Sequence, residues 1–258
     1  MFAVTKIEFS SALGKGFIWR KLHLIYNPGY VCVNLNHKNR NSNCSSSHYT
    51  DWSVQKMKIN NLKIHSSGYI FCQSEFYSVH DVLNEDSVFD FSSGLNIFNG
   101  EIDSGIWAVS YLLSMYKHRR TDFILFDEPN LTVNGERFFA DNFYVHSCYM
   151  DGLYPMFGAK VPINRLVKTE LKKSKLNYYA DEIKDIFDLD SERFQKPIYA
   201  TGNERFRAMA AVGFSSGKDV FCFPWMSKSR FESFHRNLTG LFDILEKLDK
   251  IIIAPLGM

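Results

Sequence analysis

The residues from Gly100 to Trp107 have the spacing of a glycine loop that binds phosphate, but they lack its chemistry. They read G-E-I-D-S-G-I-W, and Gly100 and Gly105 occupy the two glycine positions of the pattern G-x-x-x-x-G-K-[ST]. In that pattern backbone amides surround the phosphates, the lysine reaches the β and γ oxygens, and the hydroxyl binds Mg²⁺. Here Ile106 replaces the lysine and Trp107 the hydroxyl, while Ser104 precedes the second glycine. A tryptophan beside the loop is also expected to fill it.

The segments that flank the loop suit such a motif. Residues 91–98 (F-S-S-G-L-N-I-F) predict a short buried strand that leads into the loop, and residues 106–116 predict an apolar helix after it. Strand, glycine loop and helix form the context that the motif requires. On these residues alone, a core helix after a glycine-containing turn is an equally good interpretation.

A later stretch, residues 200–225, adds a second motif. It reads A-T-G-N-E, continues R-F-R-A-M-A-A-V-G-F-S-S-G-K, and ends D-V-F-C-F-P-W. This stretch resembles the ATP-binding cassette (ABC) family, whose L-S-G-G-Q/E signature opens a helix and leads to a strand ending in Asp-Glu. Without a gap, the signature falls on Thr201, Gly202, Asn203 and Glu204, the family's R-x-R on Arg205 and Arg207, and the Asp-Glu pair of Walker B on Pro224 and Trp225.

Further segments fit the same resemblance, which covers residues from about 57 to the C-terminus. The glutamine of the Q-loop falls near Ser147, the charged amphipathic region 160–189 suits the helical subdomain, and 251–253 suits the strand before the switch histidine. Leu256 stands at that histidine's position. The segment F-I-L-F-D-E-P (123–129) looks like a Walker B strand, but it precedes the signature, so Asp127 and Glu128 are interpreted as solvated residues.

The resemblance implies an α/β fold of the P-loop NTPase type, the ABC ATPase fold, with an antiparallel β-subdomain and a helical subdomain. One such domain is expected over 1–258: mainly β-strands over 1–98, the degenerate loop with its helix and strand over 99–141, the Q-loop-like region and helical subdomain over 142–200, and the signature-like helix and degenerate Walker B over 201–258. Strand 220–223 should run parallel to 95–98, with 251–253 between them.

The residues that the resemblance places at the ATPase motifs cannot perform hydrolysis. Phosphoryl transfer needs cations on the phosphates and a carboxylate that activates water, and six of these positions hold Ile106, Trp107, Ser147, Pro224, Trp225 and Leu256. We therefore expect no catalytic residue, no metal site and no cofactor of the chain's own. ATP is expected only as a weak ligand, or at a partner's site.

Composition excludes several other classes of protein. The chain has 258 residues, 45% of them hydrophobic, and a net charge of +2, which fits a folded domain without a nucleic-acid partner. Its five cysteines show no metal-ligand spacing, and reduced thiols in a cytoplasmic protein are the default expectation. No signal peptide or membrane-length apolar run is present in the sequence, so any membrane association is expected through a partner.

Three functional hypotheses remain open. The first is a degenerate, non-hydrolysing nucleotide-binding subunit of an ABC transporter, paired with another ABC subunit, with itself as a dimer, or with a membrane permease. Thr201 and Gly202 would then face the partner's γ-phosphate. The alternative is a soluble pseudo-ATPase scaffold or regulator that uses the ABC dimerisation surface. The third is an enzyme of another class that shares only the fold. Exposed apolar residues on the helical subdomain would favour the first, and a homodimer with blocked pockets the second.

The N-terminal quarter predicts further strands. They cover 2–9, 22–26 and 30–35 with a turn at 27–29, a polar mobile loop at 37–50, then strands at 57–64 and 68–73. Phe71, Phe76 or Tyr77 could stack on an adenine. His80 and His146 are interpreted as structural residues.

Overall fold

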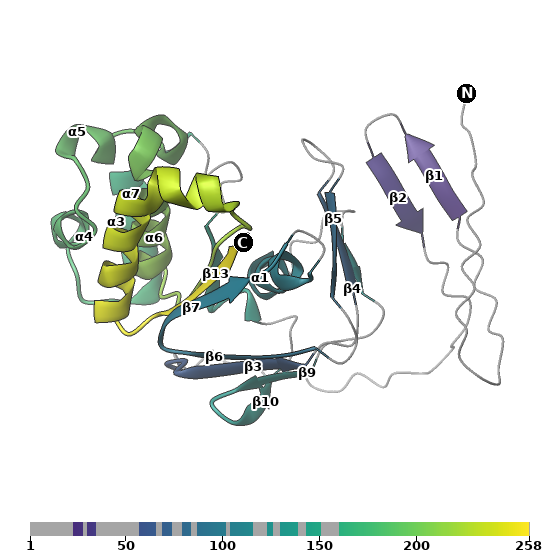
Figure 1. Cartoon of the computed structure of the whole chain (residues 1–258). Helices are drawn as coiled ribbons and strands as arrows, with labels where there is room; N and C mark the ends of the chain where they lie inside the picture. Colours follow the sequence, from purple (N-terminus) through teal and green to yellow (C-terminus); the bar gives the residue numbers. More distant parts are fainter. Residues whose placement is uncertain are drawn as a thin grey trace, which may run out of the picture.

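The structure is a computed structural model of the chain (Figure 1). It describes residues 23–27, 30–34, 57–65, 69–73, 79–83, 87–101, 104–115, 123–125, 130–138, 143–150 and 160–257. The predicted segments 2–9 and 37–50, the pair Asp127 and Glu128, and the aromatic candidates Phe76 and Tyr77 lie outside these ranges.

A parallel sheet of four strands forms the centre of the fold. Its order is β11 (Ser147–Tyr149), β12 (Val220–Cys222), β13 (Ile251–Leu256) and β7 (Gly94–Asn99), and each neighbouring pair is parallel. The predicted arrangement of the strands at 95–98, 251–253 and 220–223 is thereby confirmed. The predicted sequence of strand, glycine loop and helix is also confirmed, since α1 (Ile106–Met115) follows β7.

Helices cover one face of this sheet (Figure 1). Phe221, Ile252 and Ala254 pack on that side with α3 (Ile163–Ser174), α6 (Arg205–Ser215) and α7 (Lys228–Lys247). Of the predicted helical region 160–189, α3 and the shorter α4 (Ala180–Ile186) are present, and α5 (Ser191–Phe194) and η2 (Ile198–Glu204) extend it beyond residue 189.

The other face of the parallel sheet packs on α1. Val220, Cys222, Ile251 and Ile253 alternate with the residues of the first face, as strands buried on both sides require. Beyond α1 lies an antiparallel sheet in the order β10 (Glu136–Phe138), β9 (Asn130–Val133), β3 (Asn61–His65), β6 (Val88–Ser92). Because α1 lies between these two sheets, it is apolar on nearly all sides rather than amphipathic.

Two more sheets come from the first half of the chain. The order β5 (Val79–Leu83), β4 (Tyr69–Gln73), β8 (Phe123–Leu125) makes one, and β4 and β5 also contact α1. The hairpin of β1 (His23–Asn27) and β2 (Tyr30–Asn34) makes the other. The strands predicted at 22–26, 30–35, 57–64 and 68–73 are therefore present, shifted by a few residues at their ends.

The strand predicted at 91–98 is wrong as a single element. Its first part belongs to β6 in the antiparallel sheet, and its second part is β7 in the parallel sheet. The chain turns at Ser93 and at Gly94, whose φ of +96° favours glycine. The Asn96 side chain fixes this corner, because Nδ2 donates to the Ser92 carbonyl at 2.9 Å and to the Gly94 carbonyl at 3.0 Å.

Buried polar groups join the amino ends of the central strands. Lys250 Nζ donates to Asp219 Oδ1 at 2.6 Å, and both side chains are largely buried. Lys218 Nζ donates to the carbonyls of Tyr144 and Val145 at 2.8 and 3.0 Å. Burial lowers the pKa of His146, an effect that Asp219 partly opposes and Lys218 reinforces. These contacts hold the amino edge of the sheet, opposite the edge where the glycine loop begins.

Candidate functional site

The carboxyl edge of the parallel sheet brings together several of the predicted motif positions. Asn99 ends β7 and precedes Gly100, Leu256 ends β13, and Trp225 is the third residue after β12. Gly100 N donates to the Leu256 carbonyl at 2.9 Å. In open α/β sheets this edge is where ligands bind, so it is the candidate site.

The glycine loop is closed by hydrogen bonds within itself. Ser104 N and Ser104 Oγ both donate to the Glu101 carbonyl, at 3.2 and 2.7 Å. A Cβ added at Gly100 would lie only 2.6 Å from Ser104 Oγ and 3.2 Å from Ile106 Cδ1. The Ser104 hydroxyl and the buried Ile106 side chain therefore occupy the space next to Gly100.

Trp225 contacts the backbone at the first residue of the same loop. Its Nε1 donates to the Gly100 carbonyl at 2.9 Å. The ring also lies against Gly257, where an added Cβ would be 2.7 Å from Trp225 Cζ2. The side chain at the position of the water-activating acid is thus an indole that binds the loop backbone and offers no carboxylate.

Trp107, in contrast, points away from the loop. It is buried with Phe91, Leu112 and Val220 in the core around α1, and its Nε1 donates to the Tyr149 hydroxyl at 2.9 Å. The expectation that a tryptophan next to the loop would fill it thus needs a correction. Trp107 packs in the core, and the aromatic side chain that covers the loop comes from Trp225.

Ser147 is not part of this edge. It is the first residue of β11 and pairs with Val220, the first residue of β12, so it lies at the amino end of the sheet. The side chain is fully buried and its Oγ donates to the Leu113 carbonyl at 2.6 Å. Pro224 is buried beside Trp225 at the carboxyl edge and carries no side-chain donor or acceptor.

The signature-like residues lie in η2, just before α6. Thr201 is buried and donates its hydroxyl to the Ile198 carbonyl at 2.6 Å, so its side chain faces inward. Gly202 and Asn203 are exposed, and Gly202 has φ +57° and ψ −120°, a conformation suited to glycine. Glu204 accepts a hydrogen bond from Arg193 at 2.7 Å and thereby ties η2 to α5.

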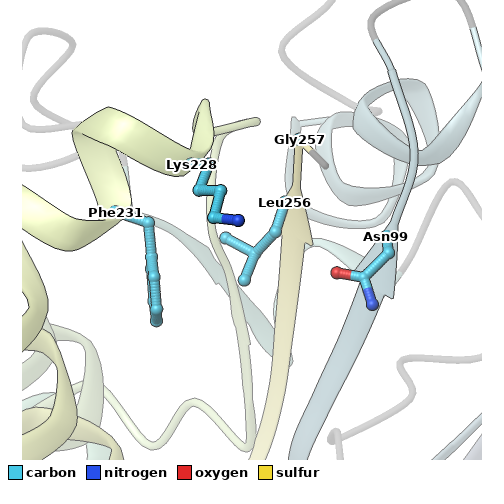
Figure 2. A pocket seen from close by; sticks show the side chains of 5 residues that line it. All are labelled: Asn99, Lys228, Phe231, Leu256 and Gly257. Atoms are coloured by element: carbon cyan, nitrogen blue, oxygen red, sulfur yellow. The ribbon is translucent and has the colours of Figure 1, made fainter.

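A pocket opens at the carboxyl edge on the α7 side (Figure 2). Its volume is about 370 Å³, and it is lined by Asn99, Lys228, Phe231, Leu256 and Gly257. Sequence reasoning identified only Leu256 among these residues. A lysine and a phenylalanine three residues apart at the start of a helix were the available signal, because that spacing places them on one helix face.

No group of three or more His, Cys, Asp or Glu side chains among the described residues is arranged to hold a metal ion. Burial raises the pKa of the Cys148 thiol to about 12, and that of Cys222 is raised as well, so both thiols stay protonated.

None of the described helices is both long and apolar enough to cross a membrane.

Comparisons with known proteins give likenesses to solved structures alone. No protein-family model and no curated protein matches the sequence. Among solved structures, the chain is similar to a protein described as "Putative ABC transporter (ATP-binding protein)" from Pyrococcus furiosus. The two share 14% sequence identity with a TM-score of 0.48, over 77% of this chain and 90% of that one. A likeness of this size does not establish the family of the chain.

Proposed function

We propose that this chain is a non-hydrolysing nucleotide-binding-domain subunit of an ABC transporter, which works with a second ABC subunit or a membrane permease. The observation that carries the proposal is the loop of residues 100–105. Its described residues lie between the edge of a parallel sheet and α1, as in a phosphate-binding loop, but Trp225 binds the Gly100 carbonyl and Ser104 binds the Glu101 carbonyl. The sequence pattern and the strand order support the ABC assignment, and the closed loop supports the loss of hydrolysis.

The distribution of exposed apolar side chains favours a protein partner on the helical region. Among the described residues, four of the six large exposed hydrophobic side chains lie between residues 160 and 200: Val161, Tyr178, Tyr179 and Tyr199. Tyr179 is 79% exposed and Tyr199 is 66% exposed. Tyrosines are enriched in protein interfaces because they bury a large apolar area and keep a polar end.

The signature-like turn is the part of this chain that would act on a partner's nucleotide. Exposed backbone at Gly202 and Asn203 lies directly before the first turn of α6, and amides at such positions suit phosphate oxygens. The inward Thr201 hydroxyl leaves this contact to the backbone. The proposed role is therefore to complete a site whose lysine and Mg²⁺ ligands belong to the partner.

The first experiment is a calorimetric titration of the full chain with Mg-ATP, together with an ATPase assay. Each charge-assisted hydrogen bond to a phosphate contributes about 1.5–3 kcal/mol. The loss of two or three such contacts weakens binding by roughly two to six powers of ten. We expect no binding and no turnover at physiological ATP. Micromolar affinity, or hydrolysis that survives a control for contaminants, would refute the non-hydrolysing role.

The second experiment identifies the partner. A photo-crosslinking amino acid replaces Tyr199 in the native host, and a matched variant carries it at exposed Lys63 on the antiparallel sheet. We expect the Tyr199 variant alone to crosslink to a polytopic membrane protein or to an ABC protein with an intact lysine-containing loop. Crosslinks only between copies of this chain would support the alternative, a pseudo-ATPase scaffold, and contradict the transporter role.

A further inference from the structure

The pocket on the α7 side of the carboxyl edge has the composition of a small-molecule site. Its volume of about 370 Å³ lies near the lower end of the range for ligand pockets. Phe231 and Leu256 form apolar walls, Asn99 supplies a carboxamide, and Lys228 supplies an ammonium group (Figure 2). Such sites combine apolar walls with a few polar groups that orient the ligand.

Lys228 gives this pocket its charge. No ion pair or hydrogen bond joins its ammonium group to another residue of the described chain, and none of the described residues that line the pocket carries a carboxylate. In Figure 2 the Lys228 side chain extends from α7 toward Leu256, across the space between the helix and the strand ends. A single uncompensated cation there favours a ligand with one negative charge.

The carboxyl edge is closed on one side and open on the other. Trp225 lies across Gly100 and Gly257 and covers the glycine loop. The pocket begins beyond them, at Asn99 and Leu256. A polyphosphate would need several cations or Mg²⁺ to offset its charge, and Lys228 is the one cation among the described residues of the pocket lining.

The apolar walls restrict the rest of the ligand. The Phe231 ring is partly buried and is held in place by an edge contact with His235, with ring centroids 5.6 Å apart. Aromatic rings pair favourably with other rings in stacked or edge-to-face geometry. Leu256 faces the same space and is itself 8% exposed.

We propose that this pocket binds a small organic acid. Its carboxylate contacts Lys228 and Asn99, and its planar apolar body packs between Phe231 and Leu256. The site uses neither the glycine loop nor a partner subunit, so its existence is separate from the proposed transporter role and can fail without affecting it.

The test is a protein-observed NMR titration of the full chain with benzoate. We expect saturable shifts of the backbone amides of Asn99, Lys228, Phe231 and Gly257. Benzamide, which has the same ring but no charge, should bind about tenfold more weakly or worse, as expected for the loss of one charge-assisted contact. Shifts that are absent, or that map elsewhere, would overturn the site.

Two lysine variants distinguish binding of benzoate in the pocket from nonspecific attraction of an anion to surface lysines. Lys228→Met keeps the aliphatic stem and should lower benzoate affinity about tenfold or more. Lys247→Met removes an exposed lysine from the last turn of the same helix and should change nothing. Equal loss in both variants, or none in Lys228→Met, refutes the proposal. Phenyl phosphate should bind no more tightly than benzoate; clearly tighter binding would overturn the assignment to a carboxylate.

Discussion

Two tryptophans stand at positions where the phosphate-binding motifs carry polar side chains, and they have different surroundings. Trp107 belongs to the core around α1 and donates to the Tyr149 hydroxyl. Trp225 is partly exposed and donates to the Gly100 carbonyl. The first residue therefore contributes to the core, while the second holds the backbone where the glycine loop begins.

At the residue scale, Trp107 should be one of the most sensitive positions for stability. Trp107→Ala is expected to lower the free energy of unfolding by about 3–5 kcal/mol, because it leaves a cavity in the core. Trp107→Phe should cost less, about 1–2 kcal/mol, since it mainly removes the donor to Tyr149. Urea unfolding measures both. Tyr199→Ala, at an exposed position, should change the unfolding free energy by no more than about 0.5 kcal/mol. A loss as large as that of Trp107→Ala would contradict the prediction.

The elements of the central sheet are joined at their amino ends by the pair Asp219 and Lys250. Lys250→Met leaves the Asp219 carboxylate buried without its partner, so we expect a loss of about 3–5 kcal/mol in unfolding free energy. The double variant Asp219→Asn with Lys250→Met should recover part of that loss, because no buried charge remains. Chemical denaturation of the three proteins gives the comparison.

A matched surface pair provides the control for this prediction. Lys58 and Asp249 form an ion pair at 3.0 Å, with side chains 54% and 68% exposed. Lys58→Met should change stability by less than about 1 kcal/mol, as for other exposed pairs. If Lys250→Met and Lys58→Met lower the unfolding free energy equally, burial of the ion pair is not the reason for the effect of Lys250→Met.

His146 should make the amino edge sensitive to acid. Burial lowers its pKa in the folded chain below the ordinary value of 6.5. Between these two values the unfolded chain binds a proton that the folded chain does not, so unfolding free energy falls as pH drops below about 6.5. His146→Gln should flatten this decline between about pH 7.5 and 5.5 in urea unfolding. The exposed His235→Gln should leave it unchanged; a variant at His146 with the wild-type slope would contradict the assignment.

For the helices and strands, the sequence predicted their order along the chain better than the residues at which they begin and end. The match of residues 201–225 to the ABC motifs predicted β12 and its neighbours, because in that family the motifs and strands follow one another in a fixed order. It missed the corner at Ser93, since the apolar pattern runs through it without interruption. It also could not reveal the contact between Trp225 and Gly100, which are 125 residues apart and meet only in the folded chain.

The whole molecule has its two cores on opposite faces of one parallel sheet, and we expect neither core to need a bound nucleotide. A site with micromolar affinity would add about 4 kcal/mol at millimolar Mg-ATP and raise Tm by about 8 °C or more for a chain of this size. We expect a Tm shift below about 1 °C in calorimetry. MgCl₂ at equal ionic strength is the control, and a larger nucleotide-specific shift would mean that the loop opens.

The position of β7 in the sheet has a consequence for how the purified protein behaves. Among the described strands, β7 pairs on one side only, with β13. Glu246 accepts a hydrogen bond from Leu95 N, but Ile97 further along the strand is 45% exposed, and an unpaired strand edge with apolar residues is a template for pairing with another chain. The isolated chain should therefore self-associate as concentration rises. Ile97→Lys should suppress this in sedimentation velocity, whereas Val161→Lys, at an exposed position outside the described strands, should not.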